Sequence, residues 1–268
     1  MTAMPSIRRR YFAIAATVAI HLAAFVFCTG TAIAQKPTAA EEFPLRADGD
    51  IGMGAYYTRS IIRGKTGSAT VLPYTYFDYG RMFARIDTFG VKTVKMGYGY
   101  LELSGRVELD GFKADVSGLQ GLNTRKNSLP LGIGTFQETP VGAFFVNAMH
   151  DVNKSTGNLF DLTYVGKFDT QKITFYPQFG AEYLSKQYTG YYYGVSTQEA
   201  LNSRYGRYQP GGAFNPFVAA MMETRISENW NLNFFLRHKW LDGSISDSPI
   251  VDRKSMDTVF FSLAYRFK

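Results

Sequence analysis

The last strand-like stretch of this chain, residues 257–268, reads DTVFFSLAYRFK. Apolar side chains occupy every second position of this stretch: Val259, Phe261, Leu263, Tyr265 and Phe267. The alternate positions are mixed and partly polar, which gives one face suited to lipid and one suited to a polar interior. The inward face of a soluble β-sandwich alternates in the same way, so the rest of the chain decides between the two folds.

The first 34 residues have the layout of a secretory signal. Three arginines at residues 8–10 precede an apolar run over residues 11–27, and a small-x-small triplet at residues 32–34 predicts cleavage before Gln35. The apolar run is shorter than the roughly 20 residues that a spanning helix needs. We therefore interpret residues 1–34 as a cleaved signal peptide rather than as a membrane anchor.

Removal of the signal changes the composition. It takes away three arginines and no acidic residue, so the formal net charge falls from +7 to +4. It also removes Cys28, the only cysteine, and leaves no thiol or disulfide chemistry. The remaining charges are interspersed without a long basic run, so we expect no nucleic-acid partner. We interpret residues 35–48 as a flexible N-terminal tether and residues 49–268 as a single domain.

Segments with a period of two, separated by turn residues, follow the tether. In the clearest of them, residues 172–184, the polar side is too charged for a buried core. Residues 230–240 have aromatic side chains at both ends of their apolar side, as in the interfacial girdles of membrane barrels. The predicted strands are residues 49–58, 69–79, 81–95, 98–110, 127–138, 140–151, 158–168, 172–184, 214–227, 230–240 and 257–268.

This pattern predicts an all-β fold, a transmembrane antiparallel outer-membrane β-barrel. A closed barrel of this type needs an even number of strands, whereas the segments number eleven. We therefore expect that one segment is split or wrongly assigned and that the barrel has ten or twelve strands.

The polar faces of the predicted strands bring charges of both signs to the inside of the barrel. A barrel of this size encloses little more space than long side chains fill, so we expect an internal network of salt bridges that stiffens it. A narrow polar conduit is the functional alternative. The predicted lumen residues are Glu102, Arg106, Glu108, Asp110, Asp161, Lys167, Lys172, Glu182, Glu223, Arg225, Arg237, Lys239 and Arg266.

The mature chain offers few groups for catalysis. His150 and His238 are its only histidines, and no carboxylate spacing around them matches a metal site. His150 adjoins Asp151, but neighbouring residues on a strand point to opposite faces. No glycine-rich phosphate loop or dinucleotide motif is found. We therefore predict that the protein is not an enzyme and binds no metal or cofactor.

Three longer connections, residues 110–126, 185–212 and 242–256, are the expected recognition sites. The second contains a run of tyrosines, followed by Ser196 and Glu199 at the spacing of a capping box. The tyrosines could present a surface to a partner or close the mouth of the barrel. The candidate partner-contacting or loop-structuring residues are Tyr191, Tyr192, Tyr193, Gly194, Ser196, Glu199, Arg207, Pro210, Asp247, Ser248, Pro249 and Asp252.

Two blocks in these connections resemble a known family. YYYGVS at residues 191–196 with Glu199, and DSPIVD at residues 247–252, are similar to the MipA/OmpV family of outer-membrane proteins. The resemblance implies a barrel in the outer membrane of a Gram-negative bacterium, surrounded by lipid. It also implies a scaffold that joins a murein hydrolase, a lytic transglycosylase, to a murein synthase. Other members resemble adhesins or permeability factors, so a surface adhesin and a narrow route for solutes or antibiotics are alternatives.

Overall fold

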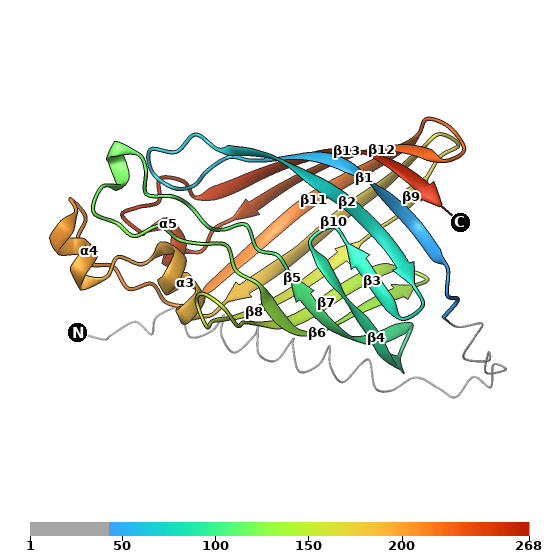
Figure 1. Ribbon diagram of the computed structural model, residues 1–268, viewed down its shortest axis with the longest axis horizontal. Helices are drawn as coiled ribbons and strands as arrows, with labels where there is room; N and C mark the ends of the chain where they lie inside the picture. The colour runs from blue at the N-terminus through green and yellow to red at the C-terminus, as the bar shows by residue number, and fades with distance from the viewer. Residues whose placement is uncertain (1–42, 268) are drawn as a thin grey trace, which may run out of the picture. The chain divides into compact units, whose positions relative to one another are not determined.

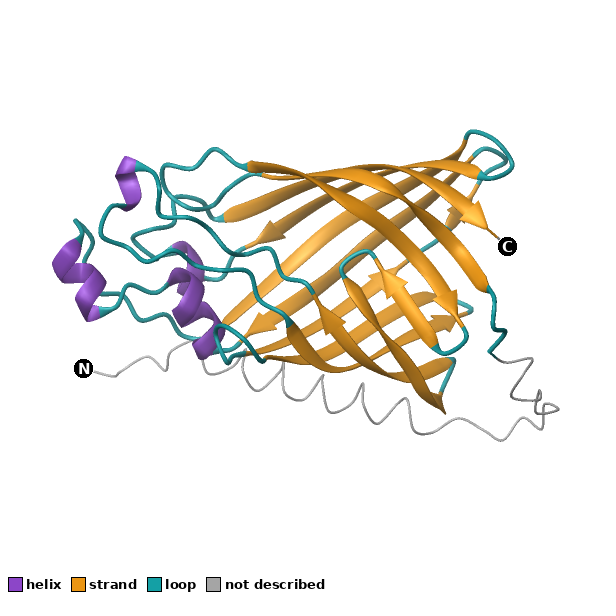
Figure 2. Cartoon of the chain, in the orientation of Figure 1, coloured by secondary structure: helices purple, strands orange, loops and turns teal. Residues whose placement is uncertain are grey.

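Antiparallel strands follow one another around a closed sheet in the computed structural model (Figure 1), which describes residues 43–267. The proposed signal peptide, Cys28 and tether residues 35–42 lie outside the described residues. The strands are β1 Ala47–Thr58, β2 Ser68–Tyr79, β3 Met82–Arg85, β4 Thr88–Met96, β5 Gly99–Arg106, β6 Pro130–Thr139, β7 Gly142–Asp151, β8 Asn158–Val165, β9 Phe168–Asp169, β10 Ile173–Leu184, β11 Ala213–Arg225, β12 Trp230–Trp240 and β13 Ser255–Phe267. The helical segments are η1 Ser117–Leu119, α3 Lys186–Tyr193, α4 Thr197–Asn202 and α5 Gly243–Ser246 (Figure 2).

The sheet closes where the first strand meets the last. β1 pairs with β13 in an antiparallel register that runs from Gly49 opposite Phe267 to Thr58 opposite Thr258. The sheet has thirteen strand segments, but β8 and β9 both pair with β10 and together form one strand of the wall. The barrel therefore has twelve strands, which confirms the larger of the two predicted numbers.

The predicted strand over residues 81–95 was wrong as a single element. These residues form the hairpin of β3 and β4, which turns at Ile86 and Asp87. Ile86 has φ of 55°, a left-handed conformation that a β-branched residue rarely adopts. The turn contains no glycine, asparagine or proline, and Asp87 alone is of a residue type common in turns, which is a weak signal in the sequence.

The two faces of the wall differ as the period of two predicts. In β13, Phe261 and Leu263 are exposed on the outside, whereas Phe260, Ser262 and Ala264 are buried on the inside. Within residues 43–267, no helix is both long enough and apolar enough to cross a membrane.

The two ends of the barrel carry different connections. The loop end has the connections of residues 59–67, 107–129, 152–157, 185–212 and 241–254. The short-turn end has the turns of residues 80–81, 97–98, 140–141, 170–172 and 226–229, together with the start of β1 and the end of β13 (Figure 1). Bacterial outer-membrane barrels have short periplasmic turns and longer extracellular loops, so we expect the loop end to face the outside.

Candidate functional site: the loop cap and the lumen

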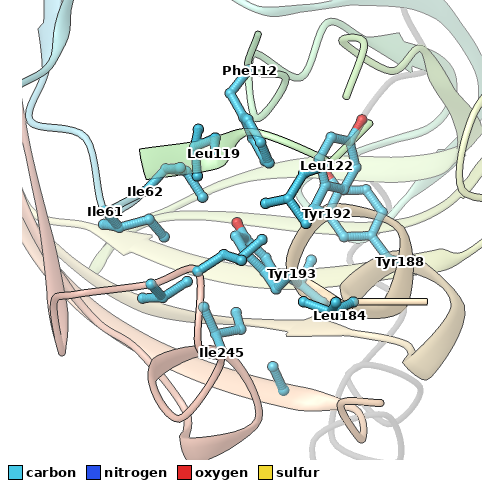
Figure 3. Close-up of a cluster of buried hydrophobic side chains, with 14 of the residues drawn as sticks. Ile61, Ile62, Phe112, Leu119, Leu122, Leu184, Tyr188, Tyr192, Tyr193 and Ile245 are labelled. Carbon is cyan, nitrogen blue, oxygen red and sulfur yellow. The ribbon is translucent and has the colours of Figure 1, made fainter. Parts of the chain in front are cut away.

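Four of the long connections pack on one another at the loop end and bury an apolar core (Figure 3). We call residues 59–67, 107–129, 185–212 and 241–254 the loop cap. Its buried side chains include Ile61, Ile62, Phe112, Leu119, Leu122, Tyr188, Tyr192, Tyr193, Val195, Tyr205, Ile245, Ile250 and Val251. Sequence reasoning missed the contribution of residues 59–67, because this short polar stretch contains only one apolar pair.

Tyrosines fasten residues 185–212 to residues 107–129. The Tyr192 hydroxyl donates to the Lys126 carbonyl at 3.0 Å, and the Lys126 N–H donates to the Tyr191 hydroxyl at 3.1 Å. The Tyr188 hydroxyl donates to the Asp110 carboxylate at 3.1 Å. Buried tyrosine hydroxyls need such partners, because an unpaired polar group inside a core is costly. The tyrosine run therefore forms the interior of the loop cap, with Tyr191 only half-buried.

Glu199 joins two connections of the loop cap, residues 185–212 and residues 107–129. The capping box is present: the Ser196 hydroxyl accepts from the Glu199 N–H at 3.2 Å, and the Glu199 carboxylate accepts from the Ser196 N–H at 2.9 Å. The same carboxylate accepts from the Asn123 N–H at 2.9 Å and lies 2.8 Å from the Arg125 guanidinium. Burial acts to raise the pKa of Glu199, but these hydrogen bonds and the Arg125 charge outweigh it and lower the pKa.

The segment of residues 247–252 fastens the remaining loops. The buried Ser248 hydroxyl donates to the Tyr193 carbonyl at 2.6 Å, and the Pro249 carbonyl accepts from the Arg63 side chain at 3.1 Å. The Asp252 N–H donates to the Ile61 carbonyl at 3.0 Å. Among the other candidate residues, Pro210 is buried, Arg207 and Asp247 are exposed, and the Gly194 carbonyl accepts from Arg125.

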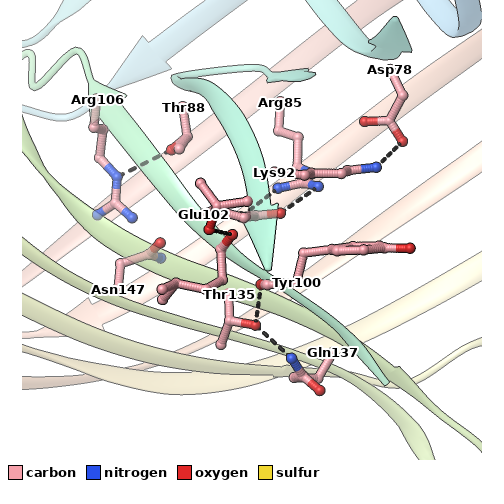
Figure 4. Close-up of polar contacts among 12 residues, drawn as sticks. Asp78, Arg85, Thr88, Lys92, Tyr100, Glu102, Arg106, Thr135, Gln137 and Asn147 are labelled. Atoms are coloured by element: carbon pink, nitrogen blue, oxygen red, sulfur yellow. Dashed lines mark hydrogen bonds and ion pairs between the residues drawn. The ribbon is translucent and has the colours of Figure 1, made fainter. Parts of the chain in front are cut away.

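Ion pairs occupy one side of the lumen (Figure 4). The Arg85 guanidinium makes two hydrogen bonds of 3.0 Å to the Glu102 carboxylate. Arg106 donates to Asp161 at 2.6 Å and lies 3.6 Å from Glu108. Sequence reasoning missed Arg85, because the hairpin that contains it was not predicted.

The other side of the lumen has a second set of pairs. Arg266 of β13 contacts Asp50 of β1 at 2.7 Å and Glu223 of β11 at 3.0 Å. Lys239 lies 2.6 Å from Glu182, while Arg237 lies above the Phe217 ring at 5.9 Å. Bidentate and charge-assisted contacts of this kind fix side-chain positions across the barrel.

Two predicted lumen residues, Lys172 and Arg225, lie outside the lumen at the short-turn end, whereas Lys167 lines the lumen at that end. Lys167, Lys172 and Arg225 are exposed, and the Lys167 ammonium lies 3.0 Å from Asp169. The last pair in the register of β10 and β11 is Ile173 with Thr224, so Lys172 and Arg225 lie beyond it. Lys167 lies in the break between β8 and β9, where the alternation is interrupted.

A cavity of about 1940 Å³ runs along the lumen. Its lining extends from Thr139 and Gly142 at the short-turn end to Ile61 and Tyr193 on the underside of the loop cap. Aromatic rings and paired charges share this lining, which suits a polar or amphipathic occupant better than a purely apolar one.

The two histidines of the mature chain lie apart. His150 contacts Asn158 at 2.8 Å from its Nδ1 atom, and His238 contacts Asp257 at 2.6 Å. Each pair joins neighbouring strands of the wall rather than converging on a common site. Among the residues that the structure describes, no group of three His, Cys, Asp or Glu side chains is arranged to hold a metal ion.

Comparisons with known proteins give a consistent result. The family model described as MltA-interacting protein MipA matches residues 51–267. YiaT of Escherichia coli (strain K12), which is named as an outer membrane protein, is 25% identical over 221 residues, 81% of this chain and 90% of the relative. The MltA-interacting protein of the same strain is 25% identical over 160 residues, 58% of this chain and 64% of the relative.

Two further matches have outer-membrane names. The outer membrane protein OmpV of Vibrio cholerae is 27% identical over 150 residues, 56% of this chain and 58% of the relative. The crystal structure of the outer membrane protein Omp33 of Acinetobacter baumannii matches 83% of this chain and 99% of its own, at 11% identity and a TM-score of 0.28.

The loop cap should loosen in acid. The folded pKa of Glu199 is lowered, so its stabilising effect is present above the unfolded value of about 4.3 and is lost as the pH falls through the folded value. Hydrogen exchange should show protected Asn123 and Ser196 amides at pH 7 and loss of that protection in acid. The variant E199Q should lose protection even at pH 7, because loss of one partner of a buried ion pair costs about 3–5 kcal/mol.

The matched control for this experiment is E228Q, in an exposed turn at the other end of the barrel. Unchanged exchange at Asn123 and Ser196 in E199Q, or an equal change in E228Q, would show that Glu199 does not hold the loop cap together.

Proposed function

Because the chain belongs to the family of the MltA-interacting protein MipA, we propose that this outer-membrane barrel of a Gram-negative bacterium is a non-enzymatic scaffold for murein-remodelling enzymes. The relative named MltA-interacting protein supports a partner among the murein hydrolases. The family resemblance adds a murein synthase as the second partner. In this proposal the barrel anchors both enzymes at the inner face of the outer membrane.

The short-turn end supplies the contact surface in this proposal. A murein scaffold needs its contacts in the periplasm, and this is the end that bacterial barrels turn toward the periplasm. Its turns carry large apolar side chains in exposed positions: Tyr98 is 64% exposed, Val141 is 72% exposed and Ile226 is 56% exposed. Because these side chains lie in three turns of the end that the proposal directs toward the periplasm, a periplasmic partner can reach each of them. This observation carries the proposal.

Charged substitutions at these turns test the scaffold. We expect V141E with I226E to weaken recovery of the lytic transglycosylase and the synthase at least tenfold in pull-downs from solubilised envelopes, a loss of about 1.4 kcal/mol. The matched control is L201E, because Leu201 is equally exposed on α4 at the loop end. Failure of the unmodified protein to recover either enzyme would contradict the scaffold.

The lumen cavity favours a second candidate, a gated route for small solutes. The cavity of about 1940 Å³ reaches the short-turn end, while the loop cap lies at its other end. In this proposal the loop cap is the gate, and solutes pass only when it opens. A surface adhesin has less support, because Tyr192 and Tyr193 are buried and offer no stacking surface to a ligand.

Planar-bilayer recordings test the gated route. The full chain should show few conductance steps, whereas deletion of residues 187–210 should give frequent steps, because it removes Tyr188, Tyr192, Tyr193, Val195 and Tyr205 from the apolar core of the loop cap. The deletion variant must first show the heat-modifiable electrophoretic mobility of a folded barrel. Recordings without conductance steps from a folded deletion variant would contradict the gated route and would leave the scaffold proposal unaffected.

A further inference from the structure

The wall of the barrel is interrupted beside the outer part of β2. This strand pairs with β1 from Ser68 to Tyr79, but with β3 only from Tyr76 to Tyr79. The Thr75 carbonyl accepts one further hydrogen bond, from the Ile86 N–H at 2.6 Å. Within residues 43–267, no strand pairs with the second edge of residues 68–74. About 23 Å of strand edge is therefore unpaired at 3.3 Å per residue.

A frame surrounds this interruption. The β3–β4 turn at Ile86 bounds it toward the short-turn end. Residues 106–113, which continue from β5, bound it on the side opposite β2. Toward the loop end, the Lys65 ammonium contacts the Asp115 carboxylate at 2.7 Å. β2 and β5 are three strands apart, so the missing strand segments leave an opening of about 14 Å between backbones. We call this framed opening the wall window.

The wall window communicates with the lumen. Residues on each side of the frame line the same cavity that runs down the barrel, among them Lys65, Thr70, Leu72, Ile86, Leu109 and Val116. The cavity is therefore continuous from the lumen to the gap in the wall.

The outward rim of the wall window is apolar. Val71 is 67% exposed, and Ile86, Val107 and Leu109 are also exposed. Val71 lies opposite Ala55 of β1, which in turn lies opposite Phe261 on the lipid face of β13. The wall window therefore opens onto the hydrocarbon of the bilayer.

Unpaired backbone groups and hydrocarbon are incompatible. Irregular or unpaired backbone at membrane depth is tolerated where it lines a water-filled cavity or meets a polar partner. The edge of residues 68–74 satisfies this condition only through the lumen, because its outer side faces lipid. A molecule that lies in the wall window must therefore offer hydrogen bonds on its lumen side and hydrocarbon on its outer side.

We propose that the wall window binds an uncharged, hydroxylated amphiphile from the outer leaflet of the membrane. Its hydroxyl groups pair with the free edge of β2, and its hydrocarbon chain stays in the bilayer against the apolar rim. A hydroxyl both donates and accepts, as an edge of N–H and C=O groups requires. Three basic side chains beside the frame already have acidic partners, Lys65 with Asp115, Arg85 with Glu102 and Arg106 with Asp161, so these bases do not call for an anionic head group.

An added peptide strand fits this edge less well than a lipid. Pro73 lies in the middle of the free edge and supplies no N–H for strand pairing. Proline on an edge strand opposes the addition of another strand.

Bromine quenching of a single tryptophan tests the proposal. The chain has two tryptophans, Trp230 and Trp240, so the reporter L72W is made in a W230F/W240F background. The protein is placed in phosphatidylcholine vesicles with a monoacylglycerol that is brominated on its chain. The fluorescence should fall about twofold when the wall window is half occupied, and the fall should saturate with the mole fraction of monoacylglycerol. The control reporter F217W, on the closed wall formed by β10 and β11, should stay unchanged.

Two further comparisons test which lipid head group binds and whether it binds in the wall window. Adding T70F and T88F to the L72W reporter narrows the frame and should abolish the quenching, whereas T163F on the closed wall should not. Each variant is first checked for the heat-modifiable mobility of a folded barrel. Equal quenching by brominated phosphatidylcholine, or stronger quenching by brominated oleate or a brominated alkylamine, would overturn the assignment. Absence of quenching by the monoacylglycerol would overturn the binding site itself.

Discussion

Pairing of backbone hydrogen bonds inside hydrocarbon is the constraint on which the rest of this structure depends. A membrane offers no water to an unpaired N–H or C=O group, so a sheet that spans it must close on itself. Here the seam of β1 and β13 achieves the closure. Gly52 lies on this seam where a Cβ atom would overlap the Leu263 carbonyl oxygen, so the close approach of the two strands requires glycine. Within residues 43–267, the long unpaired edge of β2 lies where the lumen cavity reaches the wall.

Closure also determines where the polar residues can lie. Side chains that alternate inward from twelve strands meet in a narrow space, so their charges are compensated there by bonds such as those of Arg266 with Asp50 and Glu223. At the loop end the same need is met by a small apolar core and by buried hydrogen bonds, among them those of Glu199. Function is thereby confined to the two ends, the lumen and the gap in the wall.

The sequence predicted what depends on local periodicity. The alternation in residues 257–268 gave the barrel and its lipid face, and the spacing of Ser196 and Glu199 gave the capping box. The sequence could not predict the features of the structure that depend on tertiary contacts. The split at Ile86 is marked by a single turn residue, Asp87, beside a β-branched residue that rarely adopts the left-handed conformation, and the exposure of Lys172 depends on where the register of β10 and β11 ends. The inward position of the tyrosine run likewise depends on partners such as Lys126, which lies 66 positions from Tyr192 in the chain.

The central claim is that the loop cap faces the outside of the cell and the short turns face the periplasm. An epitope inserted after Asn202, at the exposed end of α4, tests it most directly when intact cells are compared with permeabilised cells. A second epitope after Glu228, in a short turn, is the control. The account predicts that intact cells bind antibody to the first epitope and that the second is reached only after permeabilisation. The reverse pattern would contradict the orientation of the barrel, and with it the periplasmic scaffold surface.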